Sequence, residues 1–227
     1  MNKNSAITLE FKNFSEFILA NQKTVSPIEF SQKYCTFIRA MKRDEFCTES
    51  ERLASALTKE KENRFTGIIY SALCKVTEFF PNELEKFALK GYEVAKSNGD
   101  YIHMMARLND LRKVYSHRPE KLYDYIQTLY KQEKCLRQLT HHYEECIQGF
   151  KSIIRKPATL EQYENMLAYV QTEIAKLTKN KHPNDALNKL MSARHIFEQQ
   201  GNTRSTQYID MLISEIRANP ECNKSLQ

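Results

Sequence analysis

The sequence predicts an all-α protein, and three observations support this prediction. Only 5 of the 227 residues are glycine, whereas average usage would give roughly 16. Because β-sandwiches and barrels need glycine at their tight turns and bulges, this scarcity argues against a strand-rich fold. The 6 prolines fall mostly at the edges of apolar segments, as they do at helix boundaries. Within those segments the apolar residues recur with a period close to 3.6.

About ten helices are expected, and the first part of the chain holds four of them. The first spans about residues 8–21, and the second begins at Ser26-Pro27, where serine provides the N-cap and proline the first helical position. A mostly charged helix is expected at 48–61 and a strongly apolar one at 64–80. On the first helix, one side is expected to carry the apolar residues Leu9, Phe14, Phe17 and Ile18.

From Asn82 onwards the pattern becomes regular. Asn82 is expected to cap a helix that ends before Gly99, and Gly99 fits the left-handed residue that follows a helix. Asp100 is expected to cap the next helix, which runs to about Tyr115. The remaining helices are expected at residues 119–132, 135–155, 159–177, 183–201 and 203–217. We expect one α-helical domain over 1–227, with looser helices at 1–61, a stack of hairpins at 62–217 and a frayed tail at 218–227.

Charge and cysteine content favour an ordinary reduced protein. The formal net charge of +6 is divided equally between the two halves of the chain, whereas nucleic-acid binders concentrate basic residues on one face or tail. The 6 cysteines show no tight metal-binding spacing and are expected to be reduced thiols. The polar N-terminus does not have the pattern of a signal peptide, and no apolar run is long enough to span a membrane. We therefore expect a cytoplasmic protein that does not bind a membrane.

Two helix junctions share one layout. A small residue lies eight positions before a glycine in each, namely Gly91 before Gly99 and Ala193 before Gly201, and an amphipathic helix follows. This layout resembles the helix–Gly-Asp–helix junction of tetratricopeptide repeats, and the two glycines are 102 residues apart, three times the repeat length of about 34. The resemblance covers residues 82–217. It implies antiparallel helical hairpins stacked in a right-handed array, with a groove that binds partner proteins.

The resemblance also indicates which side chains would meet such a partner. His103, Arg107 and Asp110 share the polar face of the helix expected after Asp100, which would line the concave groove. Tyr115 belongs to a group of tyrosines near the end of that helix, and tyrosine is enriched at interfaces. The alternative is that the three polar residues form an ordinary solvated face and that the tyrosines are structural, with hydroxyls reaching the surface.

One pair of residues suggests catalysis. Arg112 is followed five positions later by His117, which resembles the signature of the helical ribonucleases known as HEPN domains. That resemblance implies that His117 moves protons and that Arg112 stabilises a developing phosphorane charge. The alternative is a solvated helix end, where cations oppose the negative end of the helix dipole.

Other candidate sites are weaker. His142 and Cys146, like His141 and Glu145, are one helical turn apart, as metal ligands on one helix would be. Cys146 also falls within an apolar stripe, however, so we expect it to be a core residue and expect no metal or cofactor. Two loops carry basic clusters, which are expected to be solvated: Lys151, Arg155 and Lys156, and then Lys176, Lys179, Lys181 and His182.

The function expected from these observations is a non-catalytic adaptor or scaffold. It would bind another protein or peptide, or a second copy of itself, in a groove between helices. The alternative is a helical RNA-binding or RNA-cleaving protein that uses Arg112 and His117. The sequence has no glycine-rich phosphate loop and no hydrolase or zinc-protease motif.

Overall fold

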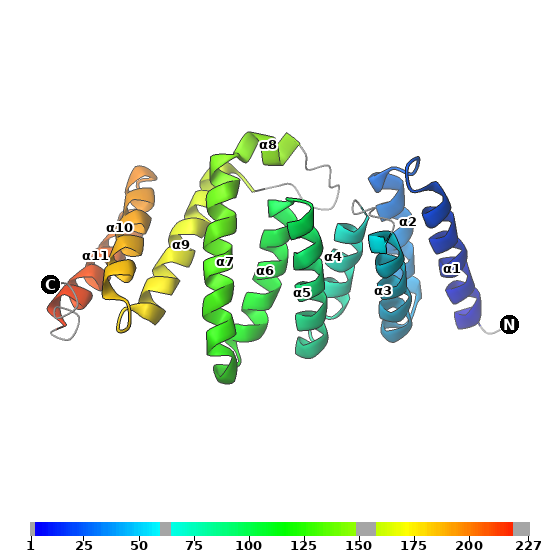
Figure 1. The fold of residues 1–227 in the computed structure, drawn as a ribbon, viewed down its shortest axis with the longest axis horizontal. Helices are drawn as coiled ribbons and strands as arrows, with labels where there is room; N and C mark the ends of the chain where they lie inside the picture. The colour runs from blue at the N-terminus through cyan, green and yellow to red at the C-terminus, as the bar shows by residue number, and fades with distance from the viewer. Residues whose placement is uncertain (1–2, 60–64, 149–157, 220–227) are drawn as a thin grey trace. The chain divides into compact units, whose positions relative to one another are not determined.

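The computed structural model describes residues 3–59, 65–148 and 158–219, and over these ranges the chain is all-α (Figure 1). This confirms the predicted fold class and the expectation of about ten helices. The first helices are α1 (Lys3–Asn21), α2 (Pro27–Ala40), α3 (Arg43–Lys59), α4 (Thr66–Val76), α5 (Pro81–Ser97) and α6 (Tyr101–Ser116). A short 3-10 turn, Pro119–Lys121, is followed by α7 (Leu122–His141), α8 (Tyr143–Gln148), α9 (Leu160–Thr178), α10 (Pro183–Gln199) and α11 (Thr203–Ala218).

Local capping signals set several helix ends where they were predicted. The Ser26 side chain accepts a hydrogen bond from the Glu29 amide, and the Glu29 carboxylate in turn accepts one from the Ser26 amide, which completes a capping box at the start of α2. Gly99 and Gly201 adopt φ values of 66° and 68° after α5 and α10. The Asp100 carboxylate accepts from the His103 amide at 3.0 Å and so caps α6.

Several expected boundaries are wrong: α3 begins at Arg43 and not near residue 48, and the helix expected over 135–155 is interrupted after His141. α5 begins at Pro81, with Phe80 in the cap position, so Asn82 lies within the first turn; proline suits this first helical position because it needs no amide partner there. The break expected between residues 132 and 135 is absent, because α7 is continuous to His141. Glu133 looks like a surface residue in the sequence, but it is buried and ion-paired in the middle of α7.

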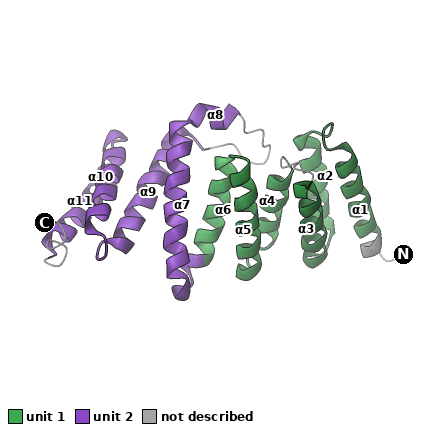
Figure 2. Cartoon of the chain, viewed as in Figure 1, with its two compact units in different colours: residues 1–114, 149–156 green, residues 115–148, 157–227 purple. Residues whose placement is uncertain are grey.

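The chain divides into two compact units, with a boundary in the sequence between Val114 and Tyr115 (Figure 2). The described helices of the first unit are α1 to α5 and most of α6, and those of the second are α7 to α11. A looser part was expected up to residue 61. Within the first unit, however, the rings of Phe30 and Phe65 stack with centroids 4.7 Å apart, so the segments on either side of that position share one core.

The core of the first unit is rich in aromatic side chains. Phe11 of α1 is fully buried and makes ring contacts with Tyr34 and Phe37 of α2 and with Phe46 of α3. The Tyr34 hydroxyl donates to the Ser50 hydroxyl at 2.6 Å, so the polar end of this buried ring is satisfied. These contacts fix α1 and α2 against α3, and they leave the opposite side of α1 outside the core.

In the first unit, α5 approaches both α4 and α6 closely at Gly91. A Cβ atom at this position would lie 2.9 Å from the Cδ of Arg107 on α6 and 2.9 Å from the Cβ of Tyr70 on α4. A small residue is therefore required here by the packing of α4, α5 and α6.

We expect Gly91→Ala to destabilise the first unit by about 1–3 kcal/mol, because the added methyl group overpacks this contact. Gly67→Ala is the matched control, since the nearest atoms to its added Cβ are ring atoms of His103 at 3.7 Å. Alanine is a better helix former than glycine, so that control should gain up to about 1 kcal/mol. Urea unfolding followed by circular dichroism measures the stability of both variants. Equal effects of the two substitutions would contradict the steric explanation.

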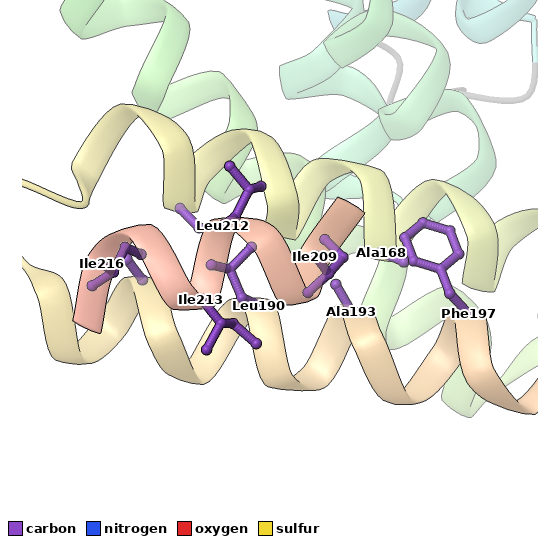
Figure 3. Close-up of a cluster of buried hydrophobic side chains, with 10 residues drawn as sticks. Ala168, Leu190, Ala193, Phe197, Ile209, Leu212, Ile213 and Ile216 are labelled. Carbon is purple, nitrogen blue, oxygen red and sulfur yellow. The ribbon is translucent and has the colours of Figure 1, made fainter. Parts of the chain in front are cut away.

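The second unit is a sequence of packed helices. α7 packs on α9, α9 on α10, and α10 on α11. Figure 3 shows the core between the last three of these helices. Ala193, the small residue eight positions before Gly201, is fully buried in this core. The labelled members of this core are Ala168, Leu190, Ala193, Phe197, Ile209, Leu212, Ile213 and Ile216.

None of the helices in the described ranges combines the length and the apolar character that a membrane crossing requires.

Candidate functional site

A groove of ≈ 580 Å³ lies between α1 and α2 in the first unit. Ile18 and Phe30 in its lining are fully buried, whereas Phe17 is 54% exposed. Phe17 thus leaves about half of an aromatic ring open to water beside buried apolar residues in a concave surface.

The lining residues come from regular positions on the two helices. On α1 they recur at intervals of three and four from Glu10 to Ile18, which is one face of the helix and about 12 Å of its length. Val25 precedes the cap of α2, and Glu29, Phe30 and Lys33 complete the lining on that helix. The capping box at Ser26 therefore positions this side of the groove.

Three charged residues border the apolar surface: Glu10, Glu29 and Lys33. Hydrogen bonds from the Ser26 amide and hydroxyl lower the pKa of Glu29, so this carboxylate is ionised at neutral pH. The Lys33 ammonium lies 5.7 Å from the centroid of the Phe37 ring. The groove thus carries two negative charges and one positive charge, although the whole chain is basic.

The sequence contained a signal for this groove that the prediction missed. At 100° per residue, the apolar positions from Leu9 to Ile18 spread over about 200° of the circumference of α1, twice the width of a minimal core-facing stripe. Phe11 faces the aromatic core. Leu9 and Phe17, which were expected on one apolar side of this helix, are 49% and 54% exposed.

The α6 residues that were predicted to line a groove make contacts within the first unit instead. Arg107 is 7% exposed, its Nη1 donates to the Tyr70 carbonyl at 2.7 Å, and its Nη2 lies 3.1 Å from Asp110 Oδ2. Its stem fills the space next to Gly91. His103 Nδ1 lies 2.5 Å from the capping carboxylate of Asp100. Arg107 therefore belongs to the interior of the first unit and does not face a partner.

Tyr115 is also enclosed. Its side chain is 6% exposed, and the Lys121 ammonium lies 5.7 Å from its ring centroid. This arrangement matches the structural alternative for the tyrosines. Tyr115 does not present a ring to a partner.

The candidate ribonuclease pair is on the surface. Arg112 is exposed on α6, and His117 is exposed just after the last residue of that helix. His117 Nδ1 lies 3.1 Å from the Ser116 hydroxyl.

The cysteine and histidine cluster is spread over two helices of the second unit. His142 Nδ1 lies 3.4 Å from Glu145 Oε2, and the rings of His141 and His142 meet edge to face at 4.5 Å. Cys135 is buried on α7. Within the described ranges, no three histidine, cysteine or acidic side chains are grouped as metal ligands.

Of the two basic clusters, only the second can be located. Lys151, Arg155 and Lys156 lie outside the described residues. Lys176 pairs with Glu173, and Lys179 pairs with Glu215, both at 3.2 Å. Carboxylates therefore offset part of the positive charge that a phosphate backbone would need.

A buried ionic network joins three helices of the second unit and was not predicted. Glu133 of α7 accepts hydrogen bonds from Lys189 of α10 at 2.7 Å, from Arg137 at 2.9 Å and from Gln171 of α9 at 3.4 Å. Burial alone would raise the pKa of Glu133, but the bonds from Lys189 and Arg137 outweigh it and hold the pKa below its ordinary value. The hydrogen bonds to Glu133 therefore connect α7 to both α9 and α10 within the second unit.

No protein-family model, no curated protein and no solved structure matches this chain. Its function is therefore inferred from the groove between α1 and α2. The exposed Phe17, the buried apolar floor and the three charged residues at the border provide the chemistry for that inference.

Proposed function

We propose that this chain is a non-catalytic, protein-binding adaptor made of stacked helical hairpins, and that it binds its partner in the groove between α1 and α2. The observation that carries the proposal is the position of Phe17, which is 54% exposed next to the buried Phe30 and Ile18. Covering this ring would release water from apolar surface that the chain itself leaves open.

The form of the groove favours a helical segment of a protein as its ligand. The lining follows α1 for about 12 Å, or two helical turns. Amphipathic helices bind such grooves with apolar residues at intervals of three, four and seven. The charged border adds selectivity, because opposite charges on a partner are attracted to Glu10, Glu29 or Lys33 and like charges are repelled.

The test is affinity capture of the tagged chain from its native lysate, with and without RNase treatment. We expect a stoichiometric protein partner that survives RNase, and we expect Phe17→Glu to reduce its recovery by at least about tenfold, because a carboxylate replaces an anchoring ring. Phe79→Glu is the matched control: Phe79 lies in the same unit, is 87% exposed and lies outside the groove, so this variant should retain the partner.

Two outcomes would contradict the proposal. One is a protein partner that both variants retain equally, which would place binding elsewhere. The other is co-purified RNA with no protein partner, which would favour the RNA-binding alternative. In that case Arg112→Ala and His117→Ala become the variants to test for loss of RNA cleavage.

A further inference from the structure

We propose that the groove between α1 and α2 binds helix α11 of a second copy of this chain, so that the protein self-associates head to tail. This inference rests on the proposed function, because it assigns an occupant to the same groove. It is carried by an exposed flank of α11 whose chemistry and spacing match α1.

The flank of α11 is defined by three exposed residues, Arg204, Tyr208 and Met211. They follow one another at intervals of four and three, so they lie within about 60° on one side of the helix. Tyr208 is 43% exposed and Met211 is 49% exposed. A different side of α11, which includes Ile209 and Ile213, packs into the core of the second unit (Figure 3).

The groove side of α1 repeats this spacing. Glu10, Phe14 and Phe17 also follow one another at intervals of four and three, and all three line the groove. On either helix the seven intervals correspond to about 10.5 Å. Two helices laid parallel can therefore align all three positions at once.

The aligned pairs are complementary in chemistry. Arg204 would lie opposite Glu10, which joins opposite charges at the border of the groove. Tyr208 would lie against Phe14, and aromatic pairs of this kind favour edge-to-face or offset stacking. Met211 would lie against Phe17, where a thioether meets an aromatic ring. The reverse orientation would place Arg204 beside Phe17 and lose the ion pair.

The proposed contact joins two different surfaces, so it is a heterologous interface. Each bound pair leaves one groove and one α11 flank open, and assembly should therefore grow with concentration. Three matched side-chain pairs make a small interface of the weak and reversible class. Dimers and longer chains should form and dissociate within the range of about 1 µM to 1 mM.

Sedimentation velocity with two half-blocked variants tests the proposal. Phe17→Glu blocks the groove, and Tyr208→Glu blocks the α11 flank; both residues are about half exposed, so both variants should fold. The wild-type mass should rise with concentration, and each variant alone should stay monomeric. An equimolar mixture should form a heterodimer and nothing larger, because only one intact groove and one intact flank can meet.

A charge reversal tests the alignment itself. Glu10→Arg alone and Arg204→Glu alone should each weaken self-association by about tenfold or more, because each places like charges opposite one another. The double variant should recover the wild-type behaviour. Phe79→Glu should assemble as the wild type does, since Phe79 lies on neither surface.

Failure of this inference can be distinguished from failure of the proposed function. If the wild type stays monomeric throughout while Phe17→Glu still loses a foreign partner in the capture experiment, the groove binds another protein and self-association is wrong. If the wild type assembles but the mixed half-blocked variants do not pair, the copies use other surfaces and the inference is again wrong. If Phe17→Glu changes neither assembly nor capture, both proposals fail.

Discussion

Replacing Phe11 with alanine is expected to destabilise the first unit by about 3–5 kcal/mol, the usual cost of truncating a buried aromatic ring. Phe11 is fully buried, and its ring centroid lies 5.0 Å from that of Phe37 and 6.1–6.2 Å from those of Phe14, Tyr34 and Phe46. These rings belong to α1, α2 and α3, so the cavity would open where the three helices meet. The loss should also reduce binding in the groove, because Phe11 holds α1 in place.

Phe17→Ala is the matched control for Phe11→Ala, since it removes the same ring from the same helix at a position that is 54% exposed. It should cost less than about 1 kcal/mol of stability, because little buried surface is lost, while it should still weaken binding in the groove. Urea unfolding followed by circular dichroism, with hydrogen exchange resolved to each unit, measures both variants. Equal destabilisation by the two substitutions would show that the aromatic core is not centred on Phe11.

Glu133→Ala is expected to destabilise the second unit by about 3–5 kcal/mol, because it leaves the buried Lys189 ammonium without its closest anion. The Glu133 and Lys189 side chains are only 8% and 11% exposed, and their ion pair measures 2.7 Å. Glu173→Ala removes a carboxylate from an ion pair in which both side chains are more than 30% exposed, and it should cost about 1 kcal/mol or less. A similar cost for the two variants would contradict the importance of burial.

Two further measurements test this explanation of the Glu133 effect. Glu133→Leu combined with Lys189→Met replaces the pair with apolar groups and should recover much of the stability lost by Glu133→Ala. The pKa of Glu133 is lower in the folded chain than in the unfolded chain. Its contribution is therefore complete above the unfolded-state pKa of about 4.3 and is lost as the pH falls through the folded-state pKa. The stability difference between wild type and Glu133→Gln should accordingly shrink on acidification, and a constant difference would contradict an ionised Glu133.

The same two units show how much could be predicted from the sequence. Helix ends at Ser26, Gly99 and Gly201 could be predicted because each depends on residues within one turn of the chain. The all-α fold could be predicted for the same reason, since apolar periodicity and scarce glycine are properties of local segments.

The faces that helices present could not be predicted in this way. Arg107 has the sequence pattern of a solvated residue, yet the missing side chain of Gly91 on another helix opens the space that its stem fills. Glu133 fell in the expected break between two helices, yet Lys189, 56 residues away, pairs with it where it is buried within α7. The burial of Arg107 and of Glu133 therefore depends on which helix packs against each of them.

The groove between α1 and α2 depends both on local sequence and on tertiary packing. The sequence by itself determined that α1 carries a broader apolar stripe than one contact can bury, and that a capped helix follows at Ser26. Only the tertiary structure decided that Phe11 enters the core and that Phe17 remains in an open groove. The physical reason is that hydrogen bonding and backbone dihedral angles are set by neighbours along the chain, whereas burial is set by neighbours in space.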